Sequence, residues 1–320
     1  MDFFPGRDGL NDLNSLKKLK SLDASLWCSE EEEFDEENDK LLTDFVCNLK
    51  QFPSLRKLTL FADSYSGRGL HVLNQLEYLE VNTFSKFDDK ILTDCFQTMK
   101  QLRHLDINYP NTLTENNLEM LVTSCQQLER LVLHIEHSDS SEPYELVCQL
   151  PTLQHLQVDH GGILRDSLIE GLINKKGSPM ESLILGPDEL PVDQVKRLCN
   201  ISTLKELEVA CNTVPLEDLL KLKNLLYLHI SMPITDDQAL NILKGLPHLK
   251  ALNILEDSEI DQVNLVNSVR TWVSGQKEQR GKIKIYLNRY IKYTDSLVEF
   301  KFDHLEPILI NKELIERDQN

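Results

Sequence analysis

The amino-acid sequence predicts an α/β solenoid, in which short parallel strands alternate with helices along the chain. Residues 113–133 place apolar side chains first at helical spacing and then in the period-2 alternation of a short strand. The same phrase recurs at residues 234–254. A helix–strand unit that recurs along a chain is the signature of a repeat architecture.

The strand part of this phrase, Leu-x-x-Leu-x-Leu, recurs with conservative replacements along most of the chain. Successive copies begin 21 to 27 residues apart, apart from one interval of 36 residues, and leucine-rich repeats have periods of about 20–29 residues. We therefore predict an α/β leucine-rich-repeat solenoid, a horseshoe with a parallel concave sheet and convex helices. The copies begin at Leu19, Leu55, Leu76, Leu102, Leu128, Leu153, Met180, Leu204, Leu225 and Leu249.

Helices are predicted in most of the intervals, because apolar residues there recur at i, i+3, i+4 and i+7. Several of them begin at Thr or Asp, whose side-chain oxygens can cap the free N–H groups of a first turn. The full helices are expected at 40–49, 89–99, 116–125, 192–199 and 236–244, and two-turn helices at 144–149 and 216–222.

The ends of the solenoid differ from its middle. Residues 1–18 read as an N-terminal lead-in, 19–260 as about ten repeats, and 261–320 as a C-terminal capping segment that shields the last repeat. In the cap we expect a helix at 261–273, strands at 282–287 and 297–302, and a helix at 305–316. The acidic run at 30–37, inside the longest interval, reads as an exposed loop insertion.

The net charge of −18 argues against a nucleic-acid or anionic-membrane surface, since the field of the chain would repel phosphate. A basic protein is the better electrostatic match. No stretch has the roughly 20 apolar residues of a membrane helix, and the N-terminus lacks a signal-peptide pattern. We expect a monomer that is cytoplasmic or nuclear.

The sequence contains none of the motifs by which we would recognise a catalytic or metal-binding site. A glycine-rich phosphate loop, H-E-x-x-H and G-x-S-x-G are all missing, so we predict neither an enzyme nor a cofactor. The seven cysteines are irregularly spaced without a CxxC pair, which predicts reduced thiols. Four of them are expected to fill the core: Cys47, Cys125, Cys148 and Cys199.

Two repeat units carry a family resemblance. Residues 125–133 and 234–240 resemble the cysteine-containing leucine-rich repeats of F-box proteins, whose phrase is C-x-x-L-x-x-L-x-L followed by I-T-D and a helix. The resemblance implies recognition of a substrate for an SCF-type ubiquitin ligase and SCF components as partners. No F-box motif precedes residue 16, so the alternatives are a fragment of a longer F-box protein and a stand-alone scaffold or inhibitor without a ligase link.

A binding face follows from the repeat frame, because residues on either side of the second leucine point to the side of the sheet away from the helices. Aromatic side chains and arginine, which are enriched in binding hot spots, gather there in neighbouring strands. The histidines, with Asp106 or Asp159, point in parallel and do not converge as zinc ligands must. We predict a protein-binding face centred on Tyr78, His104, Asn108, Arg130, His134, His155 and Tyr227.

Overall fold

The structure, a computed structural model, describes residues 18–26, 36–62, 64–107, 113–135, 142–254, 260–274, 283–287 and 308–310. Nearly all of the predicted lead-in, the predicted strand at 297–302 and the predicted site residue Asn108 lie outside these ranges. The chain forms two compact units, one of residues 1–159 with 174–179, and one of residues 160–173 with 180–320.

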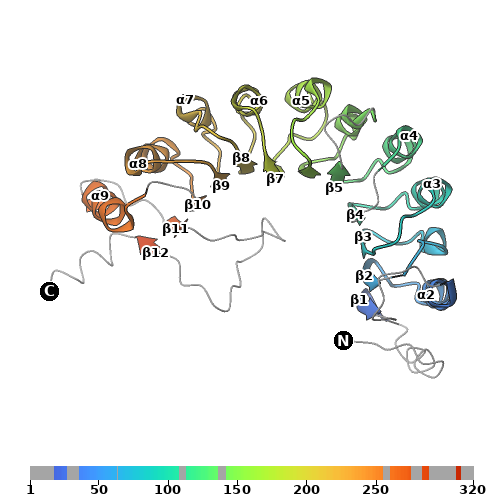
Figure 1. Ribbon diagram of the computed structural model, residues 1–320. Helices are drawn as coiled ribbons and strands as arrows, with labels where there is room; N and C mark the ends of the chain where they lie inside the picture. The colour runs from blue at the N-terminus through green and yellow to red at the C-terminus, as the bar shows by residue number, and fades with distance from the viewer. Residues whose placement is uncertain are drawn as a thin grey trace. The chain divides into compact units, whose positions relative to one another are not determined.

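In the first unit, strands alternate with α-helices or 3₁₀ turns, and each strand pairs in parallel with the next strand along the chain. The strands lie on one side of the unit and the helices on the other (Figure 1). The elements are β1 (Ser21–Leu26), α2 (Glu36–Asn48), η1 (Leu49–Gln51), β2 (Lys57–Ala62), η2 (Leu70–Val72), β3 (Tyr78–Asn82), α3 (Asp89–Thr98), β4 (His104–Ile107), α4 (Glu115–Ser124), β5 (Arg130–Ile135), η3 (Tyr144–Gln149) and β6 (His155–His160).

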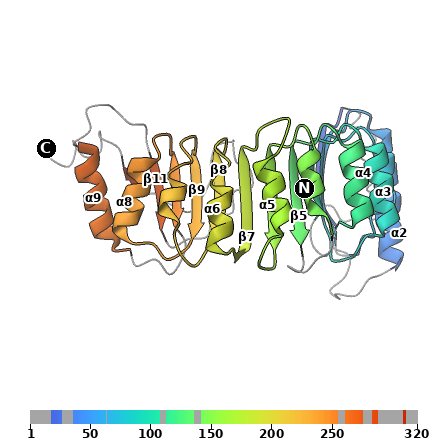
Figure 2. The same cartoon turned by 90° about the horizontal axis from the view of Figure 1, so that it is seen from above.

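The second unit repeats the same arrangement, with parallel pairing from β7 to β11 and an antiparallel last strand. Its helices also lie along one side of its strands (Figure 2). The elements are α5 (Asp166–Ile173), β7 (Ser182–Glu189), α6 (Val192–Leu198), β8 (Glu206–Ala210), α7 (Leu216–Leu219), β9 (Tyr227–Ser231), α8 (Asp236–Gly245), β10 (Ala251–Ile254), α9 (Gln262–Ser274), β11 (Ile283–Leu287) and β12 (Ile308–Ile310).

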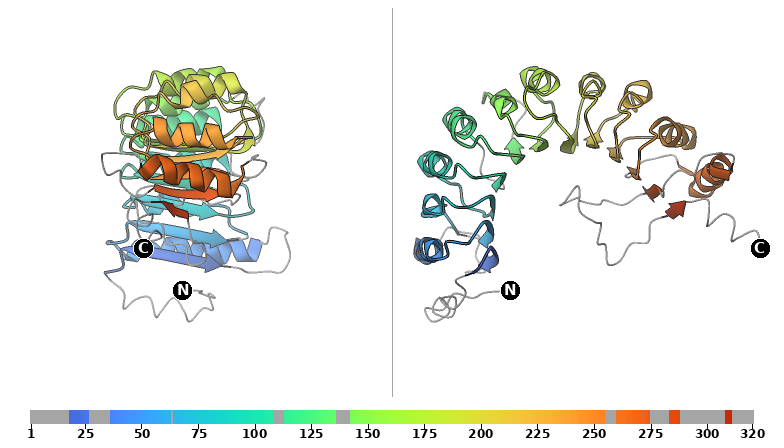
Figure 3. Two further views of the ribbon diagram at one scale, coloured as in Figure 1. Left: turned by 90° about the vertical axis from the view of Figure 1, so that its left-hand side faces the viewer. Right: turned by 180° about the vertical axis from the view of Figure 1, so that it is seen from behind.

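The core of each unit lies between its sheet and its helices, and it is built from the leucines of the repeat frame. Leu79, Leu105 and Leu131 are at most 1% exposed, and they occupy adjacent positions in β3, β4 and β5. Burying a leucine side chain contributes roughly 1.5–3 kcal/mol. The predicted leucine-rich-repeat fold class is confirmed, with the helices packed behind the sheet (Figure 3).

The predicted helix caps are present in both units. Asp88 accepts a hydrogen bond from the backbone N–H of Lys90 at 2.8 Å at the start of α3. Thr114 and Thr235 each form a reciprocal capping box with the residue three positions later. These contacts satisfy N–H groups that the first helical turn leaves without partners, which is why α3, α4 and α8 begin close to the predicted positions.

Three sequence predictions need correction. The predicted helix at 305–316 is wrong, because Ile308–Ile310 is a strand paired antiparallel with β11; two of its three residues are β-branched and favour a strand. The acidic run is not wholly a loop, since Glu36 and Glu37 form the first turn of α2, where negative charge favours the helix dipole. Helix α5 was not predicted.

The cysteine prediction is confirmed at three positions and wrong at one. Cys125, Cys148 and Cys199 are buried, and burial raises the pKa of each thiol to about 12, so these thiols stay protonated. Cys47 is exposed. Its sulfur nevertheless lies close to the backbone of Gly69, because a Cβ atom added to that glycine would be 2.7 Å from it. The six described cysteines are free thiols.

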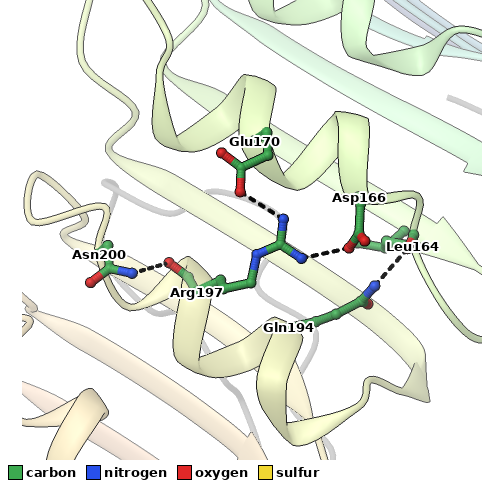
Figure 4. Close-up of polar contacts among 6 residues, drawn as sticks. All are labelled: Leu164, Asp166, Glu170, Gln194, Arg197 and Asn200. Carbon is green, nitrogen blue, oxygen red and sulfur yellow. Dashed lines mark hydrogen bonds and ion pairs between the residues drawn. The ribbon is translucent and has the colours of Figure 1, made fainter.

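Helices α5 and α6 of the second unit are joined by ion pairs at the surface, and a buried hydrogen bond links α6 to the residue two positions before α5 (Figure 4). The Arg197 guanidinium of α6 lies between two carboxylates of α5, those of Asp166 and Glu170, and its contact with Glu170 measures 2.7 Å. The Gln194 amide donates to the backbone carbonyl of Leu164 at 2.6 Å. These contacts join neighbouring repeats on the helix side of the sheet.

Candidate protein-binding face

In each unit we call the sheet face opposite the helices the inner face. In the first unit, Lys57 lies opposite Tyr78, Tyr78 opposite His104, and His104 opposite Arg130. These residues alternate with the buried leucines, as the strand period requires. His155 begins β6, the next strand, and is partly exposed. The row of residues predicted from the repeat frame is therefore present on this face.

A stack of three side chains forms the best-ordered part of the row. The Tyr78 and His104 rings are parallel within 3°, with their centroids 4.0 Å apart. The Lys57 ammonium lies 4.1 Å from the centroid of the Tyr78 ring, within the range of a cation–π interaction. Adjacent strands hold the two rings, so little side-chain entropy remains to be lost when a partner binds.

The surroundings of the two rings favour their uncharged forms. Burial, assisted by a hydrogen bond from its hydroxyl to Glu80 at 2.7 Å, raises the pKa of Tyr78. Burial is also the main reason that the pKa of His104 falls to about 3, and the nearby Arg130 charge lowers it further. His104 is therefore a neutral imidazole at physiological pH.

A second cluster links three strands beside this row. His134 of β5 lies between two aspartates, with Nδ1 3.2 Å from Asp159 of β6 and Nε2 3.7 Å from Asp106 of β4. Gln157 donates a hydrogen bond to Asp159 at 3.0 Å. The His134 side chain is 10% exposed, so it positions the aspartates more than it presents a surface of its own.

Arg130 differs from the other described arginines of the first unit. Arg56, Arg68 and Arg103 each have a carboxylate within 4.0 Å. The Arg130 guanidinium makes neither a hydrogen bond nor an ion pair with the residues that the structure describes. It is partly exposed at the first position of β5, so its five N–H donors remain available to a ligand.

The remaining predicted site residue, Tyr227, belongs to the second unit. It lies opposite Glu206 in β8 and Ala251 in β10, and burial, with the Glu206 charge as a second cause, raises its pKa. Lys57 and Glu80 belong to the site of the first unit but were not selected from the sequence, although the repeat frame places both on the inner face. A selection of aromatic residues, histidines, Arg130 and Asn108 leaves out the lysine and the carboxylate that contact Tyr78.

The inner face of the second unit is largely closed to solvent. Ser182 donates a hydrogen bond to Glu206, and both residues are 4% exposed. His229 is 2% exposed, with Nδ1 3.2 Å from Glu208. Asn253 lies opposite His229 and is fully buried, and neither of its amide atoms has a hydrogen-bond partner among the residues that the structure describes.

The described residues contain no cluster of three or more His, Cys, Asp or Glu side chains arranged to hold a metal ion. Within the same residues, no helix is both long and apolar enough to cross a membrane. The inner face of the first unit presents two stacked rings, a guanidinium and hydrogen-bonded carboxylates.

The similarity of this chain to known proteins is limited to solved structures. No protein-family model matches the sequence, and no curated protein matches it. The solved structures that it resembles include an internalin from Listeria monocytogenes (13% identity, 86% of this chain and 77% of that one, TM-score 0.47), a TDR receptor (16%, 81% and 41%, 0.46) and the yeast Rad7 and Elc1 complex (15%, 82% and 72%, 0.48). Because these scores lie below 0.5, the fold assignment rests on strand order and register.

Proposed function

We propose that this protein is a protein–protein interaction module that binds its partner on the inner face of the first unit. The observation that carries the proposal is the stack of Lys57, Tyr78 and His104 beside Arg130, which makes no ion pair with the residues that the structure describes. Preordered aromatic side chains and arginines supply much of the binding energy in protein interfaces. The proposal assigns no catalytic step to the chain.

The test is proximity labelling in cells, comparing the native chain with a triple variant, Tyr78→Ala, His104→Ala and Arg130→Ala. We expect the triple variant to lose the proteins that the native chain labels. A matched control replaces three exposed residues on the helices of the same unit, Lys50, Gln97 and Glu119, with alanine. Equal labelling by the native chain and the inner-face variant would contradict the proposal, provided both proteins have the same urea unfolding midpoint.

The resemblance of residues 125–133 to the repeats of F-box proteins supports a finer proposal, that the partner is a substrate of an SCF-type ubiquitin ligase. The net charge of −18 favours a partner that is basic over most of its surface. The test is co-purification of the native gene product with SCF components. If labelled partners are found but SCF components are not, the chain is a stand-alone scaffold or inhibitor.

A further inference from the structure

Two cations, Lys57 and Arg130, stand at the ends of this row and form no ion pair with the described residues of the first unit. Arg130 has no carboxylate within ion-pair distance among the residues that the structure describes. Lys57 is exposed, and its ammonium contacts the Tyr78 ring rather than an anion. The two cations therefore lie at opposite ends of the Tyr78–His104 stack, each with capacity for a negatively charged ligand.

The spacing of these cations suits an extended chain lying across the strands. The register places Lys57, Tyr78, His104 and Arg130 on four successive strands. Three strand steps of about 4.8 Å separate the end positions by about 14 Å. In an extended peptide, residues i and i+4 point to the same side and lie about 13 Å apart.

We propose that the inner face of the first unit binds an extended acidic segment of its protein partner. Two carboxylates four residues apart would meet Arg130 and Lys57, and the side chain midway between them would pack on the edges of the Tyr78 and His104 rings. Arg130 contributes more, because a guanidinium binds a carboxylate through two parallel hydrogen bonds. This inference rests on the proposed function and specifies the partner of that site.

Neighbouring carboxylates restrict where the acidic residues can lie. Glu80 and Asp106 occupy the next inner-face position of β3 and β4. Glu80 accepts the Tyr78 hydroxyl and Asp106 lies 3.7 Å from His134, and both repel a further anion. At physiological salt, charges are screened beyond about 8 Å. Ion pairs in direct contact therefore decide where the acidic residues of the ligand bind. The ligand is therefore a segment with two spaced acidic residues, and a continuous acidic run binds less well.

The experiment is a selection of random dodecapeptides displayed on phage against the full chain, with subtraction on the Tyr78, His104 and Arg130 triple variant. We expect enriched peptides to carry acidic residues four positions apart. One enriched peptide is then labelled and titrated by fluorescence anisotropy. Arg130→Ala should weaken its affinity about ten-fold or more, since it removes charge-assisted hydrogen bonds to a carboxylate of the peptide. Lys57→Ala should weaken it by at most about five-fold.

Arg130→Lys keeps the charge but not the paired donors, so it should recover only part of the affinity. Replacing the two acidic residues of the peptide with their amides should abolish the difference between the native chain and Arg130→Ala. Enriched peptides that need Tyr78 and His104 but show no acidic preference would overturn the acidic segment and leave the proposed function standing. Failure to enrich any peptide that needs the inner face would also overturn the inference, while the proposed function is judged by the labelling experiment.

Discussion

The inner faces of the two units share one repeat frame but differ in accessibility. In the first unit, Tyr78, His104 and Arg130 are partly exposed at successive strand starts. In the second unit, the equivalent positions of β7 and β8, Ser182 and Glu206, are 4% exposed and hydrogen-bonded to each other. The same frame thus leaves these positions partly exposed in the first unit and buries Ser182 and Glu206 in the second, where Tyr227 of β9 is partly exposed.

The position of a residue in the repeat therefore does not by itself decide whether its side chain is exposed. A polar side chain on a closed face must find its partners within the chain, because a buried polar group without a hydrogen bond is costly. A polar side chain on an open face can leave that capacity to a ligand. Glu206, which accepts a hydrogen bond from Ser182, is the clearest member of the first kind, and Arg130, which makes none with the described residues, is the clearest of the second.

The largest effect on stability is expected in β5, where a buried core residue, Leu131, follows an inner-face residue, Arg130. Leu131→Ala should lower the free energy of unfolding by about 2–5 kcal/mol, because it opens a cavity at a fully buried site. The adjacent Arg130→Ala should change it by less than about 0.5 kcal/mol. Urea unfolding measures both values. Similar losses for the two variants would contradict the separation of core and inner-face positions.

A stabilising change is expected on the closed face. Asn253→Leu should raise the free energy of unfolding by about 1–3 kcal/mol, since it removes a fully buried amide that has no hydrogen-bond partner. Asn82→Leu is the control, because Asn82 is partly exposed on the inner face of the first unit and contacts Glu80. A destabilised Asn253→Leu protein would show that the amide is paired through water.

The open face should respond to acid through His104. Its pKa of about 3 in the folded protein lies below the unfolded value of about 6.5. As the pH falls below about 6.5, His104 binds a proton in the unfolded chain but not in the folded protein. The free energy of unfolding therefore declines down to about pH 3. Unfolding midpoints should therefore fall less steeply with pH in His104→Asn. An unchanged slope would rule out His104 as a source of acid sensitivity.

The smallest expected effect lies on the helices of the second unit. Arg197→Met removes the contacts with Asp166 and Glu170, but these ion pairs lie on the surface, where salt and water weaken them. The unfolding midpoint should fall slightly at low salt and match the native value in 0.5 M sodium chloride. A large loss that persists in high salt would indicate that the pair of helices depends on this arginine.

Much of the fold could be predicted from the sequence because the repeat signal depends on local spacing. Strand starts at Tyr78, His104, Arg130 and Tyr227 follow from the leucine frame, and the register confirms their alignment within each unit. Predictions were poorer where that frame ends. Ile308–Ile310 forms a strand because β11 provides an edge for it, and helical periodicity alone did not indicate that neighbour.

The candidate site, like the fold, could be predicted in part from the sequence. Which residues alternate toward the core and which lie on the inner face follows from the order of residues, because strand periodicity is a property of the backbone. The folded arrangement was needed to show that Tyr78 and His104 stack, that Cys47 is exposed, and that Arg130 makes no ion pair with the described residues. Stacking, exposure and pairing depend on distances between side chains from separate repeats, and those distances exist only after the strands have aligned.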